Sequence, residues 1–592
     1  MQFFADWFWL VEGRFHKSLP CFPPIKRTYL SRCCNTLFSL RAYRQGTQII
    51  LIFKVHALMA TPVMTPSGSL LDEKLKKSSP GKIGGIVFAI MLVGGLIYIG
   101  IKLAKDLSIV HSASVFPFFL LGIALLIALG FEFVNGFHDT ANAVATCIYT
   151  HSLEPHIAVV YSGIMNFIGV LLSSGTVAFS IITLLPVELI LKVSKGSGFA
   201  MVFALLVAAI LWNLATWWRG LPASSSHTMI GSIIGVGIAN QLMQGNSGTS
   251  GVEWDQVIKV FKALLLSPIV GFVGAALVFY LFKLVARDPR LYEAPKGTAP
   301  PPFYIRLLLI LTCGGVSYAH GSNDGQKGMG LIMLILVGTV PTAYALNHAV
   351  GASEVQTFAA VSTQVAGVLN NYVDPGTIAQ SAEPELSRFV STKTYEPGVI
   401  LSLQQMVTDI RNEANTYGSL GKVPPDMQAN VRNQMYLTSE SFRILAKSGP
   451  AMSDADKKII ANYKGWLDKS TRFIPTWVKV AVALALGLGT MIGWKRIVVT
   501  VGEKIGKSHL TYAQGASAEL VAMCTILAAD TYGLPVSTTH VLSSGVAGTM
   551  AANKSGLQVS TIRDIALAWV FTLPAAALLS GALFWLFNTI AR

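Results

Sequence analysis

Two short polar segments with the same order of residue types lie far apart in an otherwise apolar sequence. Cassette one is LPASSSHTMIGSIIG, residues 221–235, and cassette two is LPVSTTHVLSSGVAG, residues 534–548. Each begins with Leu-Pro and continues with one apolar residue, three hydroxyl residues and a histidine. An unpaired backbone N–H inside a bilayer costs several kcal/mol. The polar residues of both cassettes must therefore face something other than lipid.

The hydroxyl residue after each Leu-Pro break favours a helix start. We expect Ser224 and Ser537 to cap half-helices whose first N–H groups point into the break. These N–H groups, the positive end of the helix dipole and nearby hydroxyls make a donor-rich cup for an anion. The hydroxyls in question belong to Ser225, Ser226, Thr538 and Thr539. Two such cups suit one anion held between the two halves. The alternative is that these hydroxyls only bond backward to the backbone of their own helices.

Two aspartates inside apolar stretches form a second repeated signal. Asp139 occurs in NGFHDTANAVAT, residues 135–146, and Asp324 occurs in AHGSNDGQKG, residues 319–328. A carboxylate within a membrane segment is costly and by default indicates an ion path. For Asp139 the alternative is a residue that caps the following helix. An offset of 185 (324 − 139) aligns the two motifs and pairs Gly136 with Gly321.

The order of motif, cassette, motif, cassette indicates an internal repeat. The cassettes are 313 residues apart (535 − 222), so the second half holds 128 additional residues (313 − 185). Residues 345–472 lose the long apolar runs and are rich in charged and amide side chains. Ser453 and Asp456 have the spacing of a capping box within it. We therefore expect a soluble helical insertion outside the bilayer.

The composition is that of a membrane protein. The chain is 52% hydrophobic and 13% charged, against about a quarter charged in soluble domains. Apolar segments recur from residue 83 to residue 590, and each can cross a hydrocarbon core, which gives about eleven or twelve spans. The predicted fold is an all-α polytopic membrane protein with two inverted repeats, broken helices at the midplane and the soluble insertion.

The expected organisation has seven parts. They are a basic extension over 1–60, an extra transmembrane helix over 83–104, an N-terminal transport repeat over 115–286, a linker over 287–303, the start of the C-terminal transport repeat over 304–344, the insertion over 345–472 and the remainder of that repeat over 473–590. For the basic extension, a start codon at Met59 or Met64 with an over-extended reading frame is the alternative.

The formal net charge of +15 comes mainly from short connections between apolar segments. This is the pattern of membrane orientation signals, so no nucleic-acid partner is expected. The linker and the segment from Lys495 to Lys507 are both basic and short, which predicts that both are cytoplasmic and that the insertion lies on the other side. The six cysteines follow no disulfide pattern.

The two motifs and two cassettes together resemble the inorganic phosphate transporter (PiT) family, most closely its bacterial low-affinity Pit-type permeases. The resemblance covers roughly residues 115–590. It implies a symporter that imports inorganic phosphate across the bacterial cytoplasmic (inner) membrane. In the bacterial branch of the family, phosphate is often transported as a neutral metal-phosphate complex, and protons drive the transport. In other branches sodium drives it. It implies no catalytic residue and no resident metal or cofactor. A homodimer is compatible with the sequence.

The resemblance also implies roles for individual residues. The coupling cation or proton is assigned to Asp139, Asn142, Asn323 and Asp324, and phosphate to Ser224, Ser225, Ser226, Thr228, Ser537, Thr538 and Thr539. His227 and His540 are accessory candidates. Three roles stay open for Lys327: it compensates the charge of Asp324, it touches phosphate, or it reaches the membrane interface.

The motifs differ between the halves, since Asn142 aligns with Lys327. This difference argues against two equivalent sodium sites and favours protons. Sodium coupling and sulfate transport stay open as alternatives. A hydrolase is disfavoured because no metal-binding or paired-aspartate motif accompanies Ser226 and His227. A passive channel would carry rings of basic residues, which are scarce in these spans.

Overall fold

The structure is a computed structural model that describes residues 38–45, 48–55, 82–108, 116–184, 197–244, 252, 254–295, 299–374, 376–377 and 381–590. The chain divides into two units, Met1–Ser69 and Leu70–Arg592. In the first unit β1 (Phe38–Gln45) pairs antiparallel with β2 (Gln48–Val55). The alternative start codons at Met59 and Met64 lie outside the described residues.

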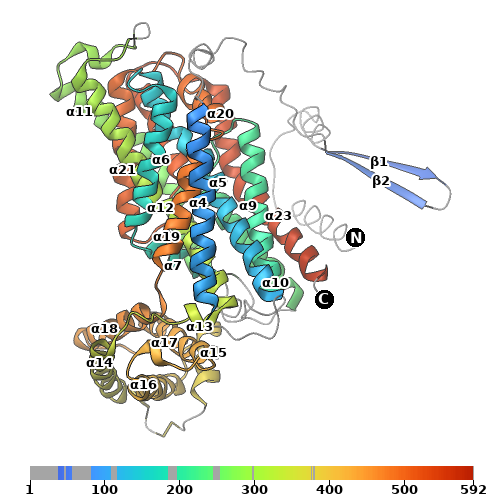
Figure 1. Ribbon diagram of the computed structural model, residues 1–592, viewed down its shortest axis with the longest axis vertical. Coiled ribbons are helices and arrows are strands. Elements are labelled where there is room, and N and C mark those ends of the chain that lie inside the picture. The colour runs from blue at the N-terminus through green and yellow to red at the C-terminus, as the bar shows by residue number, and fades with distance from the viewer. Residues whose placement is uncertain are drawn as a thin grey trace, which may run out of the picture. The chain divides into compact units, whose positions relative to one another are not determined.

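The described part of the second unit consists mainly of helices (Figure 1). The long helices outside the insertion are α4 (Lys82–Leu107), α5 (Phe116–Tyr149), α6 (Pro155–Leu172), α9 (Ser197–Trp218), α10 (Ser225–Gln244), α11 (Trp254–Val285), α12 (Phe303–Thr339), α19 (Thr476–Thr490), α21 (Tyr512–Thr531), α22 (Thr538–Ala552) and α23 (Val559–Ile590). Short helical segments between them are α7 (Thr176–Ile182), η1 (Pro289–Tyr292), α13 (Pro341–Tyr344), α20 (Lys495–Val499) and η3 (Thr500–Lys504).

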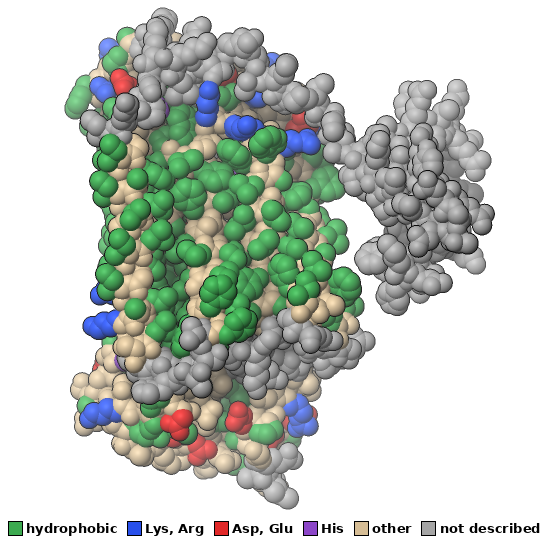
Figure 2. Space-filling view, turned by 45° about the vertical axis from the view of Figure 1, so that its right-hand side comes forward, with side chains coloured by type: hydrophobic (Ala, Val, Ile, Leu, Met, Phe, Trp, Pro, Cys, Tyr) green, Lys and Arg blue, Asp and Glu red, His purple; other side chains and the backbone are tan. Residues whose placement is uncertain are grey.

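Within the described residues, seven helices are long and apolar enough to cross a membrane, or eight if the bent pair ending in α19 is one span. Figure 2 shows hydrophobic side chains over the middle of one face and charged side chains toward its two ends. The chain is thus a multi-pass membrane protein. This number is lower than the eleven or twelve spans expected from the sequence. Helices α19 and α22 are too short to be counted, with 15 residues each, and α10 and α21 carry polar residues that face other helices.

The helices of the two halves pack on each other reciprocally. Helix α10 packs on α23 and α22 packs on α11, while α5 packs on α19 and α12 packs on α6. Glycines allow the backbones to meet. A Cβ atom on Gly136 would lie 2.3 Å from the carbonyl oxygen of Leu486, and one on Gly321 would lie 2.2 Å from that of Asn166. The glycines paired by the sequence offset therefore make equivalent contacts. The inverted sense of the repeat stays a prediction.

The sequence predicts that the helix carrying the second motif, from about residue 304 to 346, is broken at residues 321–330, and this prediction is wrong. Helix α12 is continuous from Phe303 to Thr339 and passes through the four glycines of residues 321–330 without a break. These glycines accommodate close neighbours instead of ending the helix. Gly325 faces Val170 of α6, and Gly328 faces the Glu132 side chain of α5. The motif glycines thus serve packing, and the broken helices occur at the cassettes.

The insertion consists of α14 (Ala352–Asn370), α15 (Ala382–Thr392), α16 (Gly398–Tyr417), η2 (Leu420–Lys422), α17 (Gln428–Ser448) and α18 (Asp454–Thr471). These helices share an apolar core that includes Leu386, Leu403 and Tyr463. The Ser453 hydroxyl accepts a hydrogen bond from the Asp456 N–H at 3.1 Å, which confirms the predicted cap of α18.

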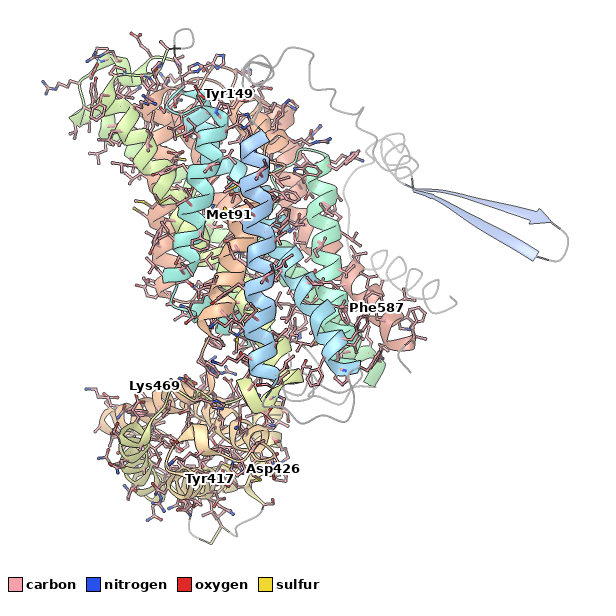
Figure 3. All side chains as sticks on the ribbon, in the orientation of Figure 1. Met91, Tyr149, Tyr417, Asp426, Lys469 and Phe587 are labelled. Carbon is pink, nitrogen blue, oxygen red and sulfur yellow. The ribbon has the colours of Figure 1, made fainter. Side chains whose placement is uncertain are left out.

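The two basic segments lie at the end of the helical body away from the insertion. The Tyr149 hydroxyl donates to Glu503 at 2.7 Å, and the Arg306 guanidinium donates to the Ser152 carbonyl at 2.8 Å. Figure 3 shows Tyr149 at the end opposite Lys469 of the insertion. This arrangement matches the one expected from the charges. Which end faces the cytoplasm stays a prediction.

Candidate functional site

Both cassettes begin where one helix ends and another starts. Gly220 and Gly533 adopt left-handed backbone conformations, with φ of 66° and 62°, which a residue without Cβ adopts at little cost. Helices α10 and α22 then start at Ser225 and Thr538. The side-chain oxygens of the preceding serines, Ser224 and Ser537, accept the backbone N–H three residues on, at 3.2 Å and 3.1 Å. Both predicted helix caps are confirmed.

The first turns of α10 and α22 meet at one carboxylate of α5. The Ser225 hydroxyl donates to Oδ2 of Asp139 at 2.5 Å, and the Thr539 hydroxyl donates to Oδ1 at 2.7 Å. The Ser226 hydroxyl donates to the carbonyl oxygen of Val536 at 2.8 Å, which also joins the two cassettes. Residues from both halves of the sequence therefore form one site, as expected from the matched cassettes.

Asp324 brings α12 into the same cluster. Its Oδ2 accepts from the Lys327 ammonium at 2.5 Å and lies 3.4 Å from the Ser225 hydroxyl, which therefore bridges the two aspartates. The ammonium also donates to the Ser226 hydroxyl at 2.5 Å. Lys327 is fully buried, so the alternative that it reaches the membrane interface is wrong.

His320 is a site residue that the sequence analysis missed. Its Nε2 lies 3.6 Å from Oδ2 of Asp324 and 3.9 Å from Oδ2 of Asp139, and its Nδ1 lies 2.7 Å from Oδ1 of Asn166. Asp139, His320 and Asp324 offer ligand atoms within 4.8 Å of one another, which is suitable for holding a cation. The spacing of four residues to Asp324 on one helix face was the signal that could have found it.

Two further candidates serve local structure. The Asn323 side-chain amide donates to the Leu534 carbonyl at 3.1 Å, so it supports the start of cassette two. The Thr228 hydroxyl donates backward to the Ser224 carbonyl at 2.9 Å, as in the alternative considered for such hydroxyls. The side chain of Asn142 lies outside the described residues.

The rings of the two cassette histidines lie against each other. The rings of His227 and His540 are 4.5 Å apart, and His540 stacks on Trp569 at 4.0 Å. Among the described residues the buried hydroxyl of Thr538 has no hydrogen-bond partner. It is thus a donor at the start of α22 that an anion could use.

The charges of the cluster do not balance. With both carboxylates ionised and the adjacent His138 and His320 neutral, Asp139, Asp324 and Lys327 carry two negative charges and one positive charge. All three side chains are buried, where electrostatic interactions are stronger than in water. An anion could enter this site only with added positive charge.

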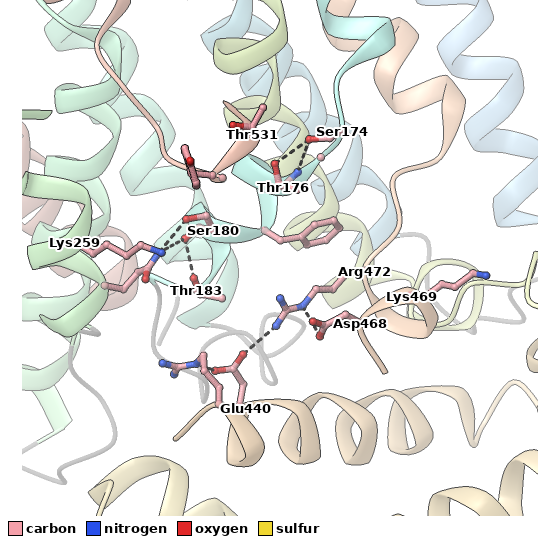
Figure 4. A pocket seen from close by; sticks show the side chains of 16 residues that line it. Ser174, Thr176, Ser180, Thr183, Lys259, Glu440, Asp468, Lys469, Arg472 and Thr531 are labelled. Atoms are coloured by element: carbon pink, nitrogen blue, oxygen red, sulfur yellow. Dashed lines mark hydrogen bonds and ion pairs between the residues drawn. The ribbon is translucent and has the colours of Figure 1, made fainter. Parts of the chain in front are cut away.

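A cavity lies elsewhere, between the insertion and the helical body (Figure 4). It has a volume of about 540 Å³ and is lined in part by α7, α11, α17 and α18. Arg472 bridges Glu440 and Asp468 there at 3.0 Å and 3.3 Å. Gly533 also lines it and directly precedes cassette two, so the cavity borders the second half-helix but not the carboxylates.

The sequence model of the phosphate transporter family matches residues 135–580, which include both motifs and both cassettes. The chain belongs to the phosphate transporter family.

Named relatives of this phosphate transporter agree. This chain is 41% identical over 486 residues to the low-affinity inorganic phosphate transporter PitA of Escherichia coli (strain K12). The match covers 78% of this chain and 97% of that protein. The identity is also 41% over 494 residues to PitB of the same strain, with 78% and 97% covered. Both carry the names of transporters and not of enzymes, as predicted.

A solved structure titled "The sodium-dependent phosphate transporter" also matches the phosphate transporter described here. The sequences are 20% identical, the match covers 80% of this chain and 99% of that one, and the TM-score is 0.44.

Proposed function

We propose that this phosphate transporter is a symporter that imports inorganic phosphate together with protons across the bacterial cytoplasmic membrane. The observation that carries the proposal is the negative cluster of Asp139, Asp324 and Lys327 at the start of both half-helices. A phosphate anion is repelled from such a cluster unless positive charge arrives with it. Coupling between the anion and a cation then follows from the charges of the site.

The contacts suggest how the two ligands depend on each other. Ser225 and Thr539 both donate to Asp139, which therefore takes donors that an anion at the cassettes would need. Protonation of Asp139 weakens these bonds and lets both hydroxyls turn to phosphate oxygens, with Thr538 as a further donor. Hydroxyl donors hold phosphate less strongly than a bidentate arginine does. This suits a carrier that must release its substrate in each cycle.

A metal ion that travels with phosphate is part of the same proposal. Asp139, His320 and Asp324 could contact a divalent ion through carboxylate oxygens and an imidazole nitrogen. In that case the metal is cargo and not a resident cofactor. Its positive charge would reduce the number of protons needed to neutralise the site.

The coupling ion can be tested by radiolabelled phosphate uptake into proteoliposomes. A proton gradient should drive accumulation, a sodium gradient alone should not, and sulfate should compete poorly. Magnesium should stimulate uptake if a metal-phosphate complex is the substrate. Uptake that follows only the sodium gradient would instead support the sodium-coupled alternative, and uptake unaffected by either gradient would exclude symport.

Replacing Ser225 with alanine should lower phosphate uptake at least about tenfold. The change removes one hydrogen bond to a charged group, worth about 1.5–3 kcal/mol. The matched control is Ser517→Ala in α21, because the Ser517 hydroxyl only bonds backward to Ala513 at 2.7 Å. Initial uptake rates of both variants, normalised to the amount of reconstituted protein, provide the comparison. Equal rates for Ser225→Ala and the control would remove Ser225 from the proposed site.

A further inference from the structure

The buried ammonium of Lys327 has two polar contacts that define its position. It lies 2.5 Å from Oδ2 of Asp324 and 2.5 Å from the Ser226 hydroxyl, and the side chain is fully buried. A buried charge is costly unless it is paired and hydrogen-bonded. The ammonium therefore occupies a defined place beside the carboxylate, as a bound monovalent cation would.

The repeat shows what stands at the equivalent place in the other half. The offset that pairs Asp324 with Asp139 pairs Lys327 with Asn142. The same offset pairs Gly321 with Gly136, whose contacts with the helices of the opposite half are equivalent. The backbone contacts of the two glycines thus agree with the sequence alignment of the two motifs. An asparagine carbonyl can ligate a cation, whereas a lysine ammonium cannot ligate one but brings its own positive charge.

We propose that Lys327 is a tethered cation that fills, at Asp324, the place a diffusible monovalent cation would otherwise take. The inference rests on the proposed symport function and specifies its ion requirement. The transport cycle then recruits mobile positive charge for one half of the site only. The ion requirement is set by a single residue, and a neutral residue at position 327 opens a second cation site.

The surroundings suit a small hard cation once the ammonium is removed. Oδ2 of Asp324, the Ser226 hydroxyl and the Ser225 hydroxyl are oxygen atoms close to the ammonium or its carboxylate. Oδ1 of Asp324 is buried and has no hydrogen-bond partner among the described residues. Sodium prefers oxygen ligands of this kind, so sodium is the probe of choice. The bond from Ser226 to Val536 does not involve Lys327 and should hold the cassettes together in the variant.

The test compares the full-length wild type with Lys327→Asn, which restores the residue type of the other half, and with Lys327→Arg, which keeps the charge. Lys457→Asn in the insertion is the matched control, because the Lys457 side chain is 61% exposed and far from the cluster in sequence. Phosphate uptake is measured in proteoliposomes at fixed pH and membrane potential, with either sodium chloride or choline chloride outside.

Sodium should change uptake by less than about twofold in wild type, Lys327→Arg and Lys457→Asn. In Lys327→Asn, uptake should be low in choline and rise about tenfold with sodium, with one additional positive charge moved per phosphate. Uptake by Lys327→Asn that equals the wild type in choline would overturn the proposal. So would a folded Lys327→Asn protein that is inactive in both salts, because Lys327 would then be needed for phosphate itself.

A binding measurement separates this inference from the proposed function. In detergent, sodium should raise the melting temperature of Lys327→Asn more than that of the wild type, since a ligand that binds only the folded state stabilises it. The additional increase should vanish in the double variant Asp324→Asn/Lys327→Asn. An equal sodium effect in wild type and Lys327→Asn would overturn the tethered cation. A wild type that takes up no phosphate would overturn only the symport function. Lys327→Gln replaces Lys327→Asn if the latter cannot be purified.

Discussion

Phosphate uptake should fall at least about 100-fold when Asp139 is replaced by asparagine, because the loss of one buried charge-pairing group costs about 3–5 kcal/mol. The amide keeps the size of the side chain, and its single oxygen can accept from either Ser225 or Thr539, the two hydroxyls that now bond separate carboxylate oxygens, while its NH2 group only donates. It takes up no proton at neutral pH and has no negative charge to balance a cation. The variant should therefore fold and yet lose the coupling between phosphate and positive charge.

Asp324→Asn should give a loss of similar size for a different reason. It leaves the buried Lys327 ammonium with the Ser226 hydroxyl but without its carboxylate.

The control for both aspartate variants is Asp288→Asn in the linker. The pKa of Asp288 is lowered to about 2 by hydrogen bonds from the Arg290 side chain, the Tyr304 hydroxyl and the Arg290 backbone N–H. Asp288 lies outside the site, so phosphate uptake by the Asp288→Asn protein should stay near that of the wild type. If Asp139→Asn transports phosphate normally, coupling does not pass through this carboxylate.

The second large effect is expected at Gly321, where α12 meets α6. A Cβ atom there would lie 2.2 Å from the Asn166 carbonyl oxygen and 2.8 Å from the Asn166 Cα and carbonyl carbon. The Gly321→Val protein must separate the two backbones, at a cost of about 1–3 kcal/mol or more. Asn166 also bonds His320, so the separation would displace a residue of the site. We expect a lower melting temperature in detergent and less folded protein.

The matched control for this prediction is Gly130→Ala in α5. No described atom lies within 4 Å of a Cβ at Gly130. Alanine in a helix is more favourable than glycine by about 0.5–1 kcal/mol, so this protein should be at least as stable as the wild type. Melting temperatures from tryptophan fluorescence would compare the two. A Gly321→Val protein as stable as the control would show that α6 and α12 do not pack this closely.

The cassette starts were predictable because helix capping is local. A hydroxyl residue after Leu-Pro needs only the next few backbone N–H groups, and Ser224 and Ser537 use them as expected. The insertion was visible for a related reason, since a soluble helix such as α18 requires charged and polar residues along its exposed face. The repeat order of motifs and cassettes predicted that the two halves share a site, which the contacts of Ser225 and Thr539 with Asp139 bear out.

Only the tertiary structure decided how the polar groups are shared. The sequence could not show that Ser225 bridges both aspartates, because Asp139 and Asp324 come from different helices. It also suggested a break in α12 at residues whose glycines instead allow close packing. A glycine permits either outcome, and the neighbouring helix determines which occurs.

The sequence by itself determined the residue types that can bind an anion and a cation in a membrane, their order in two halves and the membership of a transporter family. The tertiary structure decided that Lys327 points inward to Asp324 and that His320 joins the carboxylates. The physical reason is the range of the interactions. Caps and apolar spans depend on neighbours along the chain, whereas the partners of a buried charge depend on which helices pack together.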